Sequence, residues 1–268
     1  MLGFKRLRAL KIETSGFKGA QRGGAHTART MMLAELSELL DCCGESAVAP
    51  ADFRQAIEEN NCLGKRSAKS RTLTYRHLVD LYGLSDAQLV FRGLRYFWNK
   101  DPDGRPLMAL CAALARDRIL ADLAPRIWAA EPGALVTREW VEEQIEVLDP
   151  GRFSPATRKS VAQNINATLT QSGHLRGRMK KYRVTAQPTS GAVAYALLLS
   201  WASGVLGPAL FQTLYAKAMD CVIEDAIVLA EGASRRGWMR FKRLGEVMEV
   251  AFPDIANATD LERLHEQD

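Results

Sequence analysis

The chain has 268 residues, 47% of them apolar and 25% charged, which is enough for a sizeable hydrophobic core and excludes wholesale disorder and a fibrous repeat. Lysine and arginine outnumber aspartate and glutamate by 36 to 31, a formal net charge of +5 that suits a protein with an anionic partner. The five cysteines include no CxxC pair and the four histidines lie far apart, so the sequence argues against a disulfide framework and a zinc site and favours the reducing cytoplasm.

Residues 1–29 are expected to form a basic N-terminal arm. The segment lacks the unbroken apolar run of a secretory signal, and its single acidic residue is Glu13. Its basic residues are Lys5, Arg6, Arg8, Lys11, Lys18, Arg22 and Arg29. We expect such an arm to be poorly ordered on its own and able to lie along phosphates.

Residues 30–149 are expected to form an N-terminal helical domain. Apolar residues at helical spacing predict helices over 30–40, 50–60, 85–98, 106–130 and 137–148, and a further helix from a Ser67 or Ser70 cap to Gly83. The helix over 137–148 is predicted to turn four apolar side chains to the core, namely Trp140, Val141, Ile145 and Leu148.

The charge distribution changes at 149–151, where we place the boundary to a C-terminal basic domain, residues 150–268. No aspartate or glutamate occurs from Gly151 to Met219, and acidic residues return at Asp220. The basic residues of the same tract are Arg152, Arg158, Lys159, Arg176, Arg178, Lys180, Lys181, Arg183 and Lys217. A long basic tract without carboxylates is typical of a surface that binds a polyanion.

Within this tract, residues 154–185 have the order of a winged helix. Ser154 and Pro155 are a typical helix start. One face of the helix is apolar, and the opposite face is predicted to contact base edges through Lys159, Ser160, Gln163, Asn166 and Thr170. The strand-prone segment that follows is predicted to be a wing on phosphates, with contacts from Arg176, Arg178, Lys180, Lys181 and Arg183. The acidic helix over 137–148 then supplies the first helix of a helix-turn-helix.

Two further basic segments are weaker candidates for nucleic-acid contact. The turn and helix over 61–76 offer Lys65, Arg66, Lys69, Arg71 and Arg76, either as phosphate contacts or as an ordinary exposed helix face. Residues 238–252 alternate as a β-hairpin around Leu244-Gly245. This hairpin is either a second wing or is held to the helical core by Trp238, Phe241 and Phe252.

Neither a membrane span nor an enzyme is expected. The longest apolar stretch, residues 193–215, has the length of a span, but Gly207-Pro208 divides it, so we expect two buried helices. The chain contains no phosphate-binding loop, dinucleotide fingerprint or hydrolase motif. The glutamates within 139–146 are expected to be solvated rather than ligands of a nuclease metal. His174 is either a phosphate contact or a turn residue. The sequence therefore predicts no catalytic residues, no metal and no cofactor.

The N-terminal half of the chain resembles the BrxA family, accessory proteins of BREX phage-defence systems. The resemblance rests on the runs AHTARTMMLAELSELL, FRQAIEENNCLGKRSAKSRTLTYRHLVDLYGL and FRGLRYFW and covers about residues 26–130. It implies a mainly α fold and DNA binding without catalysis, alongside a methyltransferase, an ATPase and a phosphatase-like component. The chain is longer than typical members, with the basic arm and the late hairpin as additions, so residue roles do not transfer directly.

Together these patterns predict a mainly α fold, a helical bundle with helix-turn-helix or winged-helix-like elements and one or two short β-hairpins. The predicted function is that of a non-catalytic, cytoplasmic accessory protein of a BREX-type phage-defence system, which binds double-stranded DNA and works with other BREX components. A scaffold that docks an acidic protein partner and an RNA-binding protein are the alternatives, and the sequence leaves the oligomeric state open.

Overall fold

Short helices with polar or glycine ends make up the first half of the chain in the computed structural model, which describes residues 24–260. They are η1 (Ala25–Thr27), α1 (Leu33–Cys43), α2 (Pro50–Arg54) with the π-helical turn η2 (Gln55–Glu59), α3 (Ala68–Tyr82), α4 (Leu89–Lys100), η3 (Pro102–Gly104), α5 (Arg105–Arg116) and α6 (Arg118–Trp128). The helices predicted over 30–40, 50–60 and 67–83 are confirmed. Ser67 is the N-cap of α3, because its hydroxyl accepts a hydrogen bond from the Ser70 backbone, and Gly83 is the C-cap.

The single helix predicted over 106–130 is wrong, because the chain forms two helices there, α5 and α6. The break lies at Asp117, whose carboxylate accepts a hydrogen bond from the Leu120 backbone N–H at 3.2 Å and so caps α6. Residues 1–23 of the expected basic arm lie outside the described residues. The end of that arm packs on the protein, since His26 in η1 is fully buried.

The second half of the chain adds helices and two small antiparallel hairpins. Its elements are α7 (Arg138–Leu148), α8 (Pro155–Gln171), β1 (Leu175–Arg176), β2 (Tyr182–Arg183), α9 (Ser190–Ala202), η4 (Gly207–Gln212), α10 (Leu214–Lys217), α11 (Ile223–Arg235), β3 (Arg240–Leu244) and β4 (Val247–Ala251). The mainly α fold with short hairpins is thus confirmed. The prediction that Leu148 of α7 packs in the core is wrong, because this residue is 37% exposed at the end of the helix.

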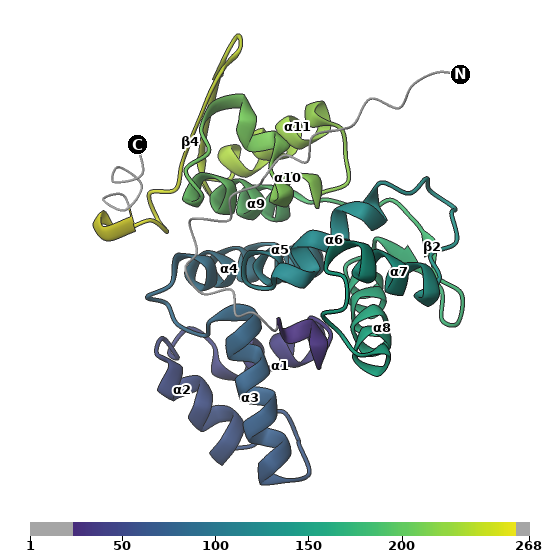
Figure 1. Ribbon diagram of the computed structural model, residues 1–268. Coiled ribbons are helices and arrows are strands. Elements are labelled where there is room, and N and C mark those ends of the chain that lie inside the picture. Colours follow the sequence, from purple (N-terminus) through teal and green to yellow (C-terminus); the bar gives the residue numbers. More distant parts are fainter. Residues whose placement is uncertain (1–23, 261–268) are drawn as a thin grey trace, which may run out of the picture.

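Helix α9 forms the centre of the hydrophobic core and packs on α4, α5, α10 and α11. Its residues from Ser190 to Trp201 are all buried. The approach to α4 is close, because a Cβ on Gly93 would lie 2.2 Å from the Leu198 side chain. Figure 1 shows α4 and α5 in the middle of the molecule, with α9 to α11 on one side and α1 to α3 on the other.

The apolar stretch over 193–215 is divided as predicted, with α9 ending at Ala202 and Gly207–Pro208 opening the 3-10 turn η4. Between residues 24 and 260 no helix combines the length and the apolar character needed to cross a bilayer. The domain boundary expected near residue 150 lies between α7 and α8, which pack against each other. The division into two domains stays a prediction.

Candidate nucleic-acid interface

Residues 118–184 contain, in chain order, α6, an extended segment, α7, α8, β1 and β2, which includes the predicted succession of a helix and two short strands over 154–185. The extended segment, residues 133–136, pairs with β2. Gly133 N–H donates to the Arg183 carbonyl at 2.7 Å, and Val136 N–H donates to the Lys181 carbonyl at 2.8 Å. Strand β2 pairs with β1 on its other edge. Residues 133–136, β2 and β1 therefore lie side by side as a small three-stranded arrangement. The strand-like pairing of residues 133–136 was not predicted from the sequence.

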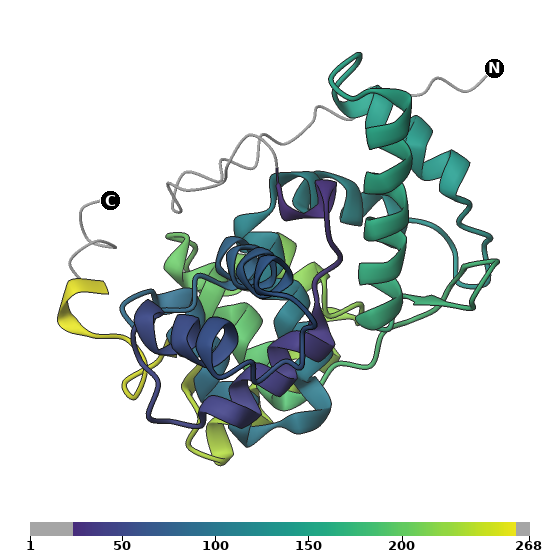
Figure 2. The same ribbon diagram turned by 90° about the horizontal axis from the view of Figure 1, so that it is seen from below.

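Helices α7 and α8 pack against each other across a short turn, and their use as a helix-turn-helix stays a prediction. The turn between them is fixed by Glu146 near the end of α7, whose carboxylate accepts a hydrogen bond from the Gly151 N–H at 2.9 Å and pairs with Arg158 of α8. Ser154 caps α8 as predicted, with its hydroxyl accepting from the Thr157 N–H. Figure 2 shows α8 at the edge of the molecule, standing away from the central helices.

Only part of the predicted reading face of α8 is available to a ligand. Lys159, Ser160 and Gln163 in its first half are exposed. Asn166, however, is only 6% exposed, so its prediction as a base contact is wrong. Thr170 is half-buried, and its hydroxyl donates to the Asn166 carbonyl at 2.7 Å. The segment η1 packs on the second half of α8, where His26 and Met31 hydrogen bond to Asn164 and Thr168.

The loop between β1 and β2, residues 177–181, carries exposed cations. Arg176, Arg178 and Lys180 are exposed, and Met179 between them is 92% exposed. Gly177 has a φ of +118°, and a Cβ there would lie 2.0 Å from the Lys180 carbonyl oxygen, so the loop requires glycine. Lys181 is partly used inside the loop, because its ammonium donates to the Gly177 carbonyl at 2.6 Å.

Arg183 is not a phosphate contact, which corrects the prediction. Its side chain is 3% exposed and forms a bidentate ion pair with Asp220, with N–O distances of 2.5 and 2.8 Å. Asp220 also accepts a hydrogen bond from the Ala186 N–H. The acidic residue that ends the carboxylate-free tract thus neutralises a buried arginine and fixes the base of the hairpin.

His174 is a buried structural residue rather than a phosphate contact. Its ring lies 5.3 Å from the Trp128 ring and hydrogen bonds to the Ser172 hydroxyl and the Ala218 carbonyl. Burial lowers the pKa of His174 to about 4, with nearby Arg183 acting in the same direction and Asp220 opposing it. The imidazole is therefore neutral at physiological pH and carries no charge for a phosphate.

The second basic segment lies on a different part of the fold. Helix α3 packs on η2, α5 and η1, and α8 packs on α7, η1, β1 and α6, so η1 contacts both helices. Arg66, Lys69 and Arg76 are exposed, and Arg71 is half-buried. Lys65 forms an ion pair with Glu35 at 3.1 Å, which reduces its value as a phosphate contact. The structure does not bring these residues together with α8.

A buried polar cluster, His26, Asp117 and Thr168, fastens α8 to the rest of the protein and was not predicted. The His26 Nδ1 lies 2.8 Å from Asp117 and its Nε2 lies 2.8 Å from the Thr168 hydroxyl. All three side chains are essentially inaccessible. The Thr168 hydroxyl also accepts from the Met31 N–H, and Asn164 donates to the His26 carbonyl. In the sequence the only sign of the Asp117 cap is a polar residue between two apolar runs.

Three of the four glutamates of α7 form ion pairs with arginines, and the fourth, Glu143, is exposed. Arg138 pairs with Glu139 and with Glu142, and Arg158 pairs with Glu146. Among residues 24–260 no group of three potential ligand side chains has the arrangement of a metal site.

No protein-family model matches the chain, and no curated protein matches it at a significant level.

Proposed function

We propose that the chain is a double-stranded DNA-binding protein that uses the winged-helix-like unit, residues 118–184. The observation that carries this proposal is the exposed hairpin loop next to α8. Its cations Arg178 and Lys180 are solvent-exposed and have no ion-pair partner between residues 24 and 260. Charged groups held this way are free to neutralise phosphates and release counterions.

Helix α8 supplies the groups that would read sequence. The first residues of a recognition helix are those that reach base edges in a helix-turn-helix. Lys159, Ser160 and Gln163 are the exposed polar side chains in this half of α8. Lysine can pair with guanine and glutamine with adenine, while the cations of the β1–β2 loop contact the phosphates of the DNA backbone.

We further propose that the protein works without catalysis of its own, as a BrxA-like accessory component of a BREX-type defence system in the cytoplasm. The resemblance of residues 26–130 to BrxA supports the role, and the five free cysteines fit a reducing compartment. The pairing of Glu139, Glu142 and Glu146 with arginines supports a structural use of these carboxylates.

The proposal is tested by fluorescence anisotropy with a DNA duplex between 50 and 200 mM salt. Arg178→Ala/Lys180→Ala should flatten the slope of log K against log salt by about 1.8, because each phosphate contact contributes about 0.9. Lys181 is left intact because it supports the loop. The matched control is Arg54→Ala/Lys100→Ala, which removes two exposed cations of α2 and α4, both outside residues 118–184.

Equal salt slopes for the two double variants would refute the interface. A single strand or an RNA duplex that binds more tightly than DNA would assign the surface to RNA instead. Lys159→Ala/Gln163→Ala should reduce the difference in affinity between preferred and scrambled duplexes by more than it changes the salt slope.

A further inference from the structure

The tip of the loop between β1 and β2 presents a large apolar side chain to solvent. Met179 is 92% exposed, more than any other large apolar residue between positions 24 and 260. Its two neighbours in the chain, Arg178 and Lys180, are exposed cations without an ion-pair partner in the same range. Isolated exposed apolar residues are common on protein surfaces, so the surroundings of Met179 must show whether it has a use.

The backbone of this loop is closed by hydrogen bonds within itself and to the neighbouring extended segment. The Lys181 ammonium donates to the Gly177 carbonyl at 2.6 Å, and the Lys181 carbonyl accepts from the Val136 N–H at 2.8 Å. Gly177 has a φ of +118°, a conformation that other residues rarely adopt. A loop that is already closed in this way loses little conformational freedom on binding, so Met179 is presented to a ligand at a small entropic cost.

Two further exposed apolar side chains lie on the small sheet that carries the loop. Leu135 is 49% exposed and Tyr182 is 42% exposed, and the two residues are bridged between neighbouring segments. Arg176 is the partner of Tyr182 on the other side. Residues directly opposite each other in antiparallel strands share a face, so these three residues form one exposed face of the sheet. The loop and this face therefore combine apolar side chains with cations.

The acidic residues that flank this surface in the chain do not oppose the cations of the tip. From Gly151 to Met219 there is no aspartate or glutamate. Glu131 precedes the segment 133–136 at the end away from the loop, because the other end of the segment, Val136, pairs beside the loop. Glu139 follows on the side of the loop, and its carboxylate forms an ion pair with Arg138.

The β3–β4 hairpin is the other candidate for a wing, and its base is held to the helical core. The ring centroids of Phe241 and Phe211 lie 6.0 Å apart, and those of Phe252 and Trp201 lie 5.7 Å apart. Phe241 and Phe252 thus hold this hairpin to the core, as predicted from the sequence. The rest of the hairpin projects beyond the helical body (Figure 1).

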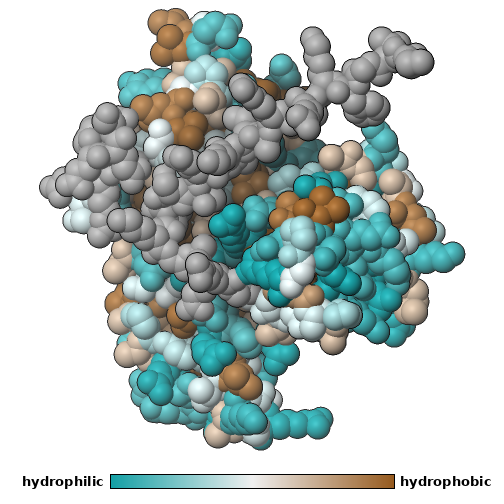
Figure 3. All heavy atoms as spheres, viewed as in Figure 1, coloured by the Kyte–Doolittle hydropathy of each residue, from teal (hydrophilic) through white to brown (hydrophobic). Residues whose placement is uncertain are grey.

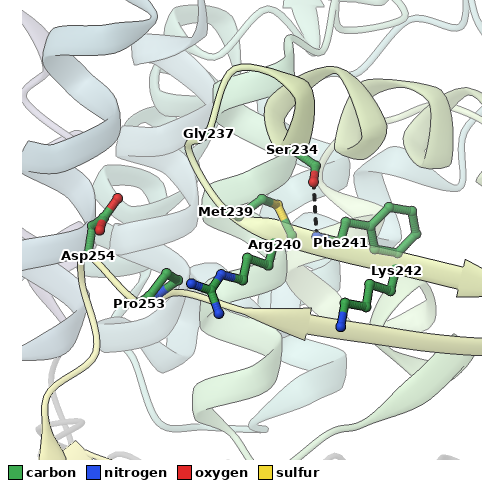
Figure 4. Close-up of a pocket in the computed structure, with 8 residues that line it drawn as sticks. All are labelled: Ser234, Gly237, Met239, Arg240, Phe241, Lys242, Pro253 and Asp254. Carbon is green, nitrogen blue, oxygen red and sulfur yellow. Dashed lines mark hydrogen bonds between the residues drawn. The ribbon is translucent and has the colours of Figure 1, made fainter.

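Acidic side chains make the β3–β4 hairpin a poorer partner for a polyanion. At its tip the exposed pair Leu244 and Val247 adjoins the exposed Glu246, and Figure 3 shows apolar and hydrophilic surface side by side at the end of the hairpin. At its root Arg240 and Asp254 line a hollow of about 390 Å³, and Figure 4 shows Arg240 extending toward Asp254. The β1–β2 loop is therefore the hairpin better suited to DNA.

We propose that Met179 inserts between neighbouring base pairs of a bound DNA duplex, from the minor groove, and unstacks one base step. This inference rests on the proposed function, since it requires that residues 118–184 bind duplex DNA. Arg178 and Lys180 contact phosphates on the two sides of the inserted side chain. The favoured ligand is a duplex with a step that opens easily, such as a TA or CA step or a mismatch.

The chemistry of the tip matches the minor groove. Proteins that bind there open base steps with apolar wedges, and methionine is among the residues they use. The groove is only about 6 Å wide, so it excludes a helix such as α8 but admits a loop with an unbranched side chain. Its negative potential attracts arginine and lysine. Phosphate contacts alone give Met179 no partner, whereas the base stack buries it.

Fluorescence anisotropy with a perfect duplex and with the same duplex carrying one central mismatch tests the proposal. The wild-type chain should bind the mismatched duplex about 10-fold more tightly, because less stacking is lost there. Met179→Ala should lose this preference, with binding to the mismatched duplex about 10-fold weaker. Its salt slope should stay unchanged, because the substitution removes no charge.

Two control variants separate the wedge from a general loss of apolar surface. Met179→Leu should keep the preference for the mismatched duplex, because leucine also serves as a wedge. Leu206→Ala should bind both duplexes as the wild type does, since Leu206 is 61% exposed between α9 and η4, outside residues 118–184.

The bend of the duplex gives a second readout. Energy transfer between dyes at the two ends should rise when the wild-type chain saturates the duplex and rise less with Met179→Ala, because wedge insertion kinks DNA by about 20–90°. A Met179→Ala variant that keeps both the preference and the bend would overturn the inference and leave the proposed function intact. A wild-type chain that binds no duplex would overturn both. Binding to vesicles of phosphatidylcholine and phosphatidylserine that depends on Met179, with duplex binding unchanged in Met179→Ala, would overturn the inference and assign the tip to a membrane surface.

Discussion

Removing the Asp117 carboxylate should destabilise the protein more than any other single loss of charge near α8. Asp117 joins three parts of the fold, because it caps α6, accepts hydrogen bonds from the His26 backbone and ring, and through His26 is linked to Thr168 of α8. Burial by itself raises the pKa of this carboxyl, but the His26 ring and the N–H donors outweigh burial and hold the pKa below its ordinary value. The group is therefore a buried carboxylate with a complete set of partners.

The size of the effect follows from those partners. Asp117→Asn keeps the shape and one acceptor oxygen but removes the charge opposite the His26 ring, 2.8 Å away. Breaking a buried pair from one side costs about 3–5 kcal/mol, and the retained oxygen offsets part of this, so we expect a loss of about 3 kcal/mol. Such a loss is a large fraction of the 5–15 kcal/mol typical of folded proteins.

Urea denaturation followed by circular dichroism measures this loss, with Asp122→Asn as the control. Asp122 pairs with Arg118 at 3.4 Å on the exposed side of the same helix, and its loss should cost no more than about 0.5 kcal/mol. The folded pKa of Asp117 is depressed, so its contribution is present above the ordinary pKa of about 3.9 and is lost as the pH falls through the folded value. The stability gap between wild type and Asp117→Asn should therefore narrow below about pH 4. Equal stability of Asp117→Asn and Asp122→Asn at pH 7 would refute the conclusion that the cluster of His26, Asp117 and Thr168 holds α8 to the rest of the protein.

Three further predictions concern the β1–β2 hairpin, its loop and the residues that support it. His174 has a folded pKa of about 4 against an ordinary value of about 6.5, so the unfolded chain takes up the proton first and stability should fall as the pH drops from about 6.5 to about 4. His174→Gln should flatten that part of a plot of urea midpoint against pH. Arg183→Met leaves Asp220 partly buried without its cation and should cost about 3–5 kcal/mol by urea denaturation, whereas Asp220→Asn/Arg183→Met should cost less than the sum of the single changes. Gly177→Ala changes no charge but distorts the loop, so anisotropy should show weaker DNA binding with a similar salt slope.

Most of the fold follows from local signals in the sequence. Ser67, Thr137 and Ser154 are side chains that hydrogen bond to backbone N–H groups one turn ahead, and each one marks the start of a helix in the structure. Gly207-Pro208 divides the longest apolar stretch as predicted. The break at Asp117 was missed because the capping carboxylate owes its place to His26, which is remote in the sequence.

The candidate interface was predicted less well, because exposure depends on distant partners. The angular position of Asn166 on α8 places it opposite Val161, yet its side chain is buried in the fold. Arg183 follows the exposed cations of the hairpin closely in the sequence, yet its partner in the fold is Asp220. Residues whose surroundings are set by their own loop, such as Arg178 and Lys180, were predicted correctly to be exposed.

If α8 reads DNA as proposed, the carboxylates of the preceding helix α7 must repel the phosphates as little as possible. In a helix-turn-helix the first helix crosses the DNA backbone, and unpaired glutamates there would repel the phosphates. In α7 the glutamates at 139, 142 and 146 are paired with Arg138 and Arg158, whereas Glu143 is exposed and has no ion-pair partner between residues 24 and 260. Under the proposed function, these two arginines would act on binding without touching DNA, since they reduce the negative charge of α7 while Lys159 and the hairpin cations stay free. The basic tract is accordingly divided by role. Arg158 and Arg183 hold the unit together, and the exposed cations of α8 and the β1–β2 loop remain for the ligand.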